Sequence, residues 1–199
     1  RLEQLEKQYG FSEFINLGQV PSDNLFVDIG ANIGELGVAL DGVCRYVGIE
    51  ASPEIFKALK QNAENLENSV LMNLAASNQN GEADFYLDDD SADSSLIRPA
   101  NGAETTRVVT RRLDSISELA GQKIQILKIE AEGSEPEVLF GSEGLLQNVE
   151  YIFIDVGFER LGNSPLPLIS EYLNLHGFDF IHLRGPRLIG IWRNRSFRE

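Results

Sequence analysis

The sequence predicts an α/β fold with a doubly wound, mostly parallel sheet of seven strands that ends in an antiparallel hairpin. Two observations support this fold class. Short apolar runs alternate with segments whose apolar residues recur at helical spacing along most of the 199 residues. Acidic residues stand at the ends of four of these runs, at Asp28, Glu50, Glu130 and Asp155. Ligands of such sheets bind beyond the carboxyl ends of the strands, so the four acids predict one binding site.

The first predicted strand, Leu25–Ile29, leads into a glycine turn and then a helix. The N–H groups of a helix N-terminus point at whatever lies over such a turn. The spacing Gly30-x-x-x-Gly34 differs from the Gly-x-Gly-x-x-Gly of dinucleotide sites, and Asp28 would repel a pyrophosphate. A carboxylate here suits a cation. The turn therefore favours a cofactor with an ammonium or sulfonium group, such as S-adenosylmethionine (SAM).

The second and third predicted strands extend this site. Glu50 ends the second strand, Tyr46–Ala51, where an acid can accept hydrogen bonds from both ribose hydroxyls. Ser52-Pro53 then starts a helix, with the serine as its N-cap. The third strand, Val70–Ala76, ends in alanines that either leave room for a flat ring or permit close helix packing. The predicted cofactor residues are Asp28, Gly30, Ala31, Asn32, Gly34, Glu50, Ala51 and Ala75.

The domain organisation follows from length and pattern. We expect one globular domain over residues 21–199, preceded by a helical lead-in over residues 1–20. A β/loop insertion is expected near residues 81–112, because two alternating segments there flank the long loop Ser91–Glu104. Asp88–Asp90 could hold a divalent cation or form a solvated turn, and we predict no metal site.

The C-terminal half continues the strand and helix alternation. Asp114 is expected to cap a short helix, and Ile124–Glu130 to form the fourth core strand. The spacing Ser134-x-x-Glu137 predicts a capping box on the next helix. The remaining elements are a strand, a helix and the closing hairpin, over residues 151–155, 164–176, 178–183 and 188–192.

Composition excludes some classes of partner. The net charge of −14 opposes binding to nucleic acid or to an anionic membrane surface. No apolar run approaches the roughly 18 residues of a spanning helix. Cys44 is the only cysteine, which rules out an intrachain disulfide and a cysteine metal cluster. We therefore expect a cytoplasmic enzyme with a small-molecule substrate, and the composition leaves its oligomeric state open.

Several motifs together resemble those of the FkbM-type SAM-dependent methyltransferases. Val27–Gly34 resembles the first motif of that family, and Glu50–Pro53 its acid-x-x-Pro motif. Leu127–Glu135 is similar to its most specific signature, Lys-Ile-Asp-x-Glu-Gly-x-Glu, with Glu130 in place of the aspartate. The resemblance covers about residues 24–180. A second departure is Gly157, where relatives commonly have a histidine.

The resemblance implies a Rossmann-like class I methyltransferase that transfers a methyl group from SAM to a hydroxyl of a small acceptor, such as a sugar, a glycoside or a natural-product intermediate. A hydroxyl must lose its proton, which requires a base or a metal. Glu130 is the first candidate to act as that base or to orient the acceptor, followed by Asp155 and Glu132. Two alternatives are a non-catalytic SAM-binding module and a nicotinamide-dependent oxidoreductase on a similar sheet.

Overall fold

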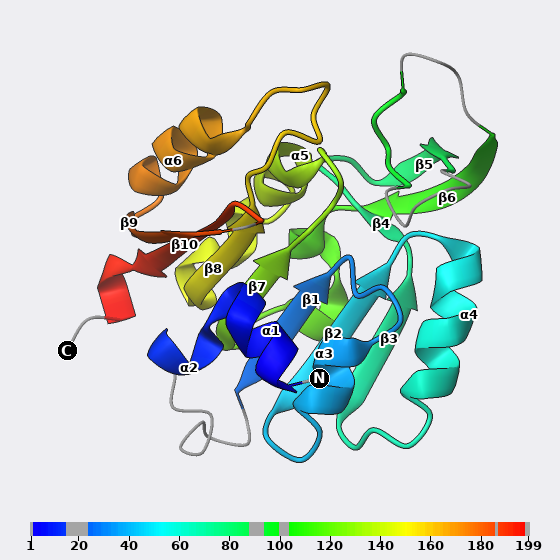
Figure 1. Ribbon diagram of the computed structural model, residues 1–199, viewed down its shortest axis with the longest axis horizontal. Coiled ribbons are helices and arrows are strands. Elements are labelled where there is room, and N and C mark those ends of the chain that lie inside the picture. Colours follow the sequence, from blue (N-terminus) through cyan, green and yellow to red (C-terminus); the bar gives the residue numbers. More distant parts are fainter. Residues whose placement is uncertain (1, 15–23, 88–93, 100–103, 186, 198–199) are drawn as a thin grey trace.

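A seven-stranded sheet forms the centre of the computed structural model, which describes residues 2–14, 24–87, 94–99, 104–185 and 187–197 (Figure 1). Its strand order is β3-β2-β1-β7-β8-β10-β9. The pairs among the first five strands are parallel, and β10 is antiparallel to both β8 and β9. These strands are β1 (Leu25–Ile29), β2 (Arg45–Glu50), β3 (Ser69–Asn73), β7 (Ile124–Ile129), β8 (Val149–Asp155), β9 (Phe178–Arg184) and β10 (Ile189–Asn194). The predicted fold class is confirmed.

Helices cover both faces of this sheet. Side chains of β1 alternate between two cores: Val27 packs with α5 and α6, and Phe26 packs with α1, α2 and α3. Helix α4 packs through Leu59 against Leu71 of β3. The helices are α1 (Leu2–Tyr9), α2 (Phe11–Phe14), α3 (Glu35–Ala39), α4 (Pro53–Asn62), α5 (Glu135–Phe140) and α6 (Leu166–Leu175). Within the described residues, no helix is both long and apolar enough to cross a membrane.

A second, three-stranded sheet lies at the upper right of Figure 1 and has the order β4-β6-β5. Its strands are β4 (Ala75–Ala76), β5 (Gly81–Tyr86) and β6 (Thr105–Arg111). The expectation of one strand over Val70–Ala76 is therefore wrong. Residues 69–73 pair with β2, whereas Ala75 pairs with Thr110 of β6. The amide of Asn73 donates to the carbonyls of Glu50 and Ala51, so the chain leaves the large sheet where β2 ends.

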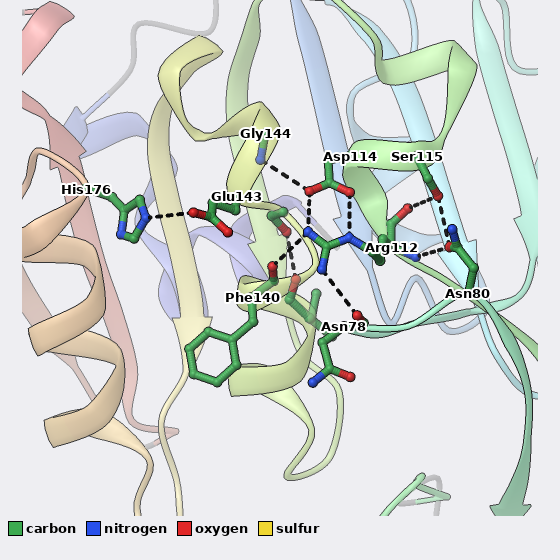
Figure 2. Close-up of polar contacts among 11 residues, drawn as sticks. Asn78, Asn80, Arg112, Asp114, Ser115, Phe140, Glu143, Gly144 and His176 are labelled. Atoms are coloured by element: carbon green, nitrogen blue, oxygen red, sulfur yellow. Dashed lines mark hydrogen bonds and ion pairs between the residues drawn. The ribbon is translucent and has the colours of Figure 1, made fainter.

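Two capping predictions differ from the structure. The segment after β6 forms two short 3-10 helices, η2 (Leu113–Ser115) and η3 (Ser117–Leu119). Asp114 lies inside η2, and its carboxylate accepts hydrogen bonds from Arg112 Nε at 2.9 Å and Nη2 at 2.6 Å, with a third from Gly144 N at 3.2 Å (Figure 2). Asp114 is thus not a helix N-cap. It ties the end of the small sheet to η4 (Glu143–Asn148), which follows α5.

The predicted capping box at α5 is also wrong. Ser134 is the N-cap residue, but its side chain makes no capping hydrogen bond, and Glu137 pairs with Arg160 instead, at 2.7 Å. By contrast, Ser52 caps α4 as predicted, accepting from Ile55 N at 3.3 Å. Residues 15–20 of the expected lead-in and Asp88–Asp90 lie outside the described residues.

Candidate cofactor-binding and active site

The site lies where the parallel strands β1, β2, β7 and β8 end at one edge of the sheet. Directly after β1, Gly30 adopts φ +72°, and a Cβ at this position would overlap the carbonyl oxygen of Glu130. Only glycine fits here without displacing the β7 strand end. The N–H groups of Gly30 and Ala31 both donate to the carbonyl of Ile49 at 3.0 Å, which fixes the turn against β2.

A first chamber opens beside this turn. It is lined by five of the predicted cofactor residues: Gly30, Asn32, Glu50, Ala51 and Ala75. Apolar side chains also line this chamber, including Ile55, Leu74, Phe85 and Leu96. Glu50 is buried, and its two carboxylate oxygens accept from Asn32 N at 3.0 Å and Ser52 N at 2.8 Å. Burial raises the pKa of Glu50, although these two hydrogen bonds favour its ionised form.

A second chamber lies on the other side of the turn, beneath α1. Its lining includes Gln8 and Tyr9 of α1 and the predicted residues Asp28 and Ala31. Four residues line both chambers and therefore form their common wall: Gly30, Asn32, Glu130 and Arg187. Gly34 lines neither chamber; it is the N-cap residue of α3 at φ +86°, and a Cβ there would press on Leu59.

Asp28 has a protein cation beside it. Its Oδ1 accepts from Lys128 Nζ at 2.7 Å, and its Oδ2 accepts from the Tyr46 hydroxyl at 2.7 Å. This pairing follows from the sheet register, in which Asp28 and Lys128 are partners on β1 and β7. Burial raises the Asp28 pKa, and the lysine opposes that effect. Both carboxylate oxygens are engaged within the protein, and direct contact between Asp28 and the cofactor stays a prediction.

Glu130 receives contacts from two directions. Lys128 Nζ lies 3.1 Å from its Oε2. From α1, Gln8 Nε2 donates to its Oε1 at 3.3 Å, and the Tyr9 hydroxyl also hydrogen-bonds the carboxylate. Burial opposes ionisation of Glu130, but Lys128, the Tyr9 hydrogen bond and the charge of Arg187 lower its pKa overall. The carboxylate is thus held ionised and in place, which suits orienting a ligand better than accepting a proton.

The other two predicted catalytic acids have different environments. Asp155 is buried beyond the described lining of both chambers; its Oδ1 accepts from Gly157 N at 2.8 Å, and burial raises its pKa to about 6. Glu132 lines the first chamber with a left-handed backbone, φ +46°, and its carbonyl accepts from Ser95 Oγ at 2.6 Å. Glu130 therefore lies where a catalytic carboxylate is needed, at the wall of both chambers. Asp155 has the higher affinity for a proton.

The loop after β7 is held by Glu135, the first residue of α5. Its buried carboxylate accepts from Ala131 N at 2.8 Å and Gly133 N at 3.1 Å, and burial raises its pKa to about 7. Ser134 Oγ is also buried, lines the first chamber and has no hydrogen-bond partner among the described residues. Such a group needs a partner, which a bound ligand can supply.

Sequence reasoning missed several residues of the site, among them Gln8, Tyr9, Lys128 and Arg187. The role of Lys128 could have been predicted, because a single lysine inside the apolar run Ile124–Ile129 requires a buried acid as its partner. The other three reach the site through tertiary packing alone. No group of three or more His, Cys, Asp or Glu side chains with metal-binding geometry occurs in the described part of the chain.

The chambers fit SAM by their chemistry. The first offers a ribose acceptor in Glu50, an apolar wall for a purine, and the unpartnered hydroxyl of Ser134. The second chamber adds carboxylates that suit an ammonium or a sulfonium.

Known structures share this fold. The magnesium protoporphyrin IX methyltransferase ChlM from Synechocystis PCC 6803, with bound SAM, superposes with a TM-score of 0.55 at 11% identity, covering 97% of this chain and 77% of that one. A SAM-dependent methyltransferase from Aquifex aeolicus gives a TM-score of 0.54 at 10% identity, with 96% and 95% coverage. The fold is therefore that of the Rossmann-like SAM-dependent methyltransferases. Residues 28–180 match the methyltransferase FkbM domain, and the chain belongs to the FkbM methyltransferase family.

Two methyltransferases of known activity are similar to this chain in sequence. Hexuronic acid methyltransferase AglP from Haloferax volcanii is 24% identical over 158 residues, which are 78% of this chain and 65% of that protein. The 2-O-methyltransferase NoeI from Sinorhizobium fredii is 24% identical over 189 residues, covering 85% of this chain and 77% of that one. This chain thus spans less than two thirds of AglP. The predicted family is confirmed.

Proposed function

We propose that this chain is a SAM-dependent O-methyltransferase that acts on a hydroxyl of a sugar or a similar small acceptor. The observation that carries the proposal is the pair of chambers that meet at Gly30 and Glu130. One has the groups for a nucleoside, and the other places carboxylates within reach of a cationic centre. The names of the relatives, a hexuronic acid methyltransferase and a 2-O-methyltransferase, support a sugar-like acceptor.

SAM supplies the methyl group: the bond from sulfur to the methyl carbon breaks, a bond from the acceptor oxygen to that carbon forms, and S-adenosylhomocysteine leaves. The contribution of the chain is alignment and proton removal. Glu130 is fixed by Lys128, Gln8 and Tyr9 and orients the acceptor hydroxyl. Asp155 lines neither chamber, but it interacts electrostatically with Glu130 and Arg187 of their common wall, and with a pKa of about 6 it is the candidate to take the proton.

The small acceptor and a cytoplasmic location belong to the same proposal. The net charge of −14 supports a small molecule over a nucleic acid, because phosphate binding needs clustered Lys and Arg. The single cysteine, Cys44, is unpaired, which agrees with a reducing compartment.

The test is transfer of a labelled methyl group from SAM to a panel of sugars and glycosides, combined with thermal-shift titration. We expect SAM and S-adenosylhomocysteine to raise the melting temperature, and label to appear in at least one hydroxylated acceptor. Stabilisation by NAD or NADP without stabilisation by SAM would contradict the proposal and favour an oxidoreductase. Binding of SAM without transfer to any acceptor would favour a non-catalytic binding module.

A further inference from the structure

Two basic residues line the chambers within the described part of the chain, Lys128 and Arg187. Lys128 is committed to the protein. Its ammonium contacts Asp28 at 2.7 Å and Glu130 at 3.1 Å, and it lies 3.3 Å from the carbonyls of Ile29 and Gly30. With three N–H donors and only 4% of its side chain exposed, it has none left for a ligand.

Arg187 differs from Lys128 in its exposure and in its free donors. It stands on the segment between β9 and β10, lines both chambers, and has 55% of its side chain exposed. Its one ion pair with a described residue is to Glu130, with Nη1 and Oε1 separated by 3.7 Å, beyond hydrogen-bond length. A guanidinium carries five N–H donors in a fork that matches a carboxylate. Arg187 therefore retains its donors at the open side of the site.

Acidic side chains surround the guanidinium of Arg187. Glu130, Asp155 and Glu132 all act electrostatically on its guanidinium. A ligand with its own negative group would be repelled by these acids unless a cation received it. Arg187 is the one basic side chain along the described lining with donors to spare.

We propose that Arg187 binds a carboxylate on the acceptor, so that the enzyme prefers acidic sugars over neutral ones. This inference rests on the proposed function, because it assigns the acceptor of the same site. Arg187 is then the residue that determines specificity, while Glu130 orients the hydroxyl beside it.

The experiment compares p-nitrophenyl β-D-glucuronide with p-nitrophenyl β-D-glucoside, which differ only in a carboxylate against a hydroxymethyl group. Calorimetry measures the binding of each to protein saturated with S-adenosylhomocysteine, and labelled SAM measures transfer. Arg187→Gln should weaken glucuronide binding about 10- to 100-fold, the loss expected for a charged hydrogen-bonding group. Binding of the glucoside and of SAM should stay within about twofold. The control is Arg107→Gln, which removes a similarly exposed arginine on β6 that pairs with Glu82 and Asp84 and lines neither chamber.

Each outcome decides a separate question. If Arg187→Gln weakens SAM and not the glucuronide, the guanidinium holds the carboxylate of the cofactor, and the assignment to the acceptor is wrong. If neither changes, or if the wild-type protein binds the glucoside as well as the glucuronide, Arg187 only screens the acids and the proposal fails. If the wild type binds the glucuronide through Arg187 but transfers a methyl group to no sugar of the panel, the carboxylate-binding role of Arg187 stands and the proposed function falls.

Discussion

Replacement of Lys128 by methionine removes the cation on which two buried carboxylates depend. Asp28 and Lys128 have 2% and 4% of their side chains exposed, and Glu130 has 14%. Methionine has a similar length and keeps the packing, but it leaves both acids without their positive partner. Breaking a buried ion pair from one side costs about 3–5 kcal/mol, because the remaining charge stays desolvated.

The assay is urea unfolding of Lys128→Met at several pH values. Without the lysine, the pKa values of Asp28 and Glu130 in the folded state rise above those in the unfolded chain. A group with a raised folded pKa stabilises the protein at low pH, and that stability is lost as the pH rises through the folded pKa. The deficit against wild type should therefore be largest near pH 8 and shrink toward pH 5.

The matched control is Lys57→Met, since Lys57 pairs with Glu54 on the surface at 67% and 80% side-chain exposure. The loss of such an exposed pair should change the free energy of unfolding by no more than about 0.5 kcal/mol. A loss of less than about 1 kcal/mol for Lys128→Met, or a deficit that does not change with pH, would refute the claim that this lysine holds the two acids.

Three further predictions concern the same site. Glu50→Ala should weaken SAM about 10- to 100-fold in calorimetry, because a charged acceptor for the ribose is lost; an unchanged affinity would reject that role. Glu135 has a folded pKa of about 7 against 4.5 unfolded, so its contribution is fully present below pH 4.5 and is lost as the pH rises through about 7. Glu135→Gln should remove about 3 kcal/mol of that pH dependence of unfolding, and a parallel pH profile would contradict it. If Asp155 is the base, kcat/KM rises with pH through about 6, and Asp155→Asn abolishes that limb; a limb that persists would move the base elsewhere.

Much of the fold could be predicted from local pattern. Buried parallel strands read as apolar runs, and the serine before Pro53 marks the start of α4, because capping depends on neighbours in sequence. The cofactor half of the site followed for the same reason: Gly30 and Glu50 sit at strand ends, and parallel strand ends share one edge.

What sequence could not supply depends on contacts between distant segments. Tyr9 and Gln8 contact Glu130, which is more than a hundred residues away in the sequence, and no local pattern near them predicts that contact. Ser134 has the spacing of a capping box, but Glu137 pairs with Arg160 instead. The division of the third predicted strand depends on β6, which comes about thirty residues later and pairs with Ala75.

The central claim is that the two chambers meeting at Gly30 form the SAM site. A crystal structure of the complex with S-adenosylhomocysteine tests it most directly. We predict density in the first chamber, with the ribose hydroxyls within hydrogen-bonding distance of Glu50 and the purine against Ala75 and Phe85. Density that leaves the Glu50 carboxylate without contact to the ligand, or that lies outside both chambers, would contradict it.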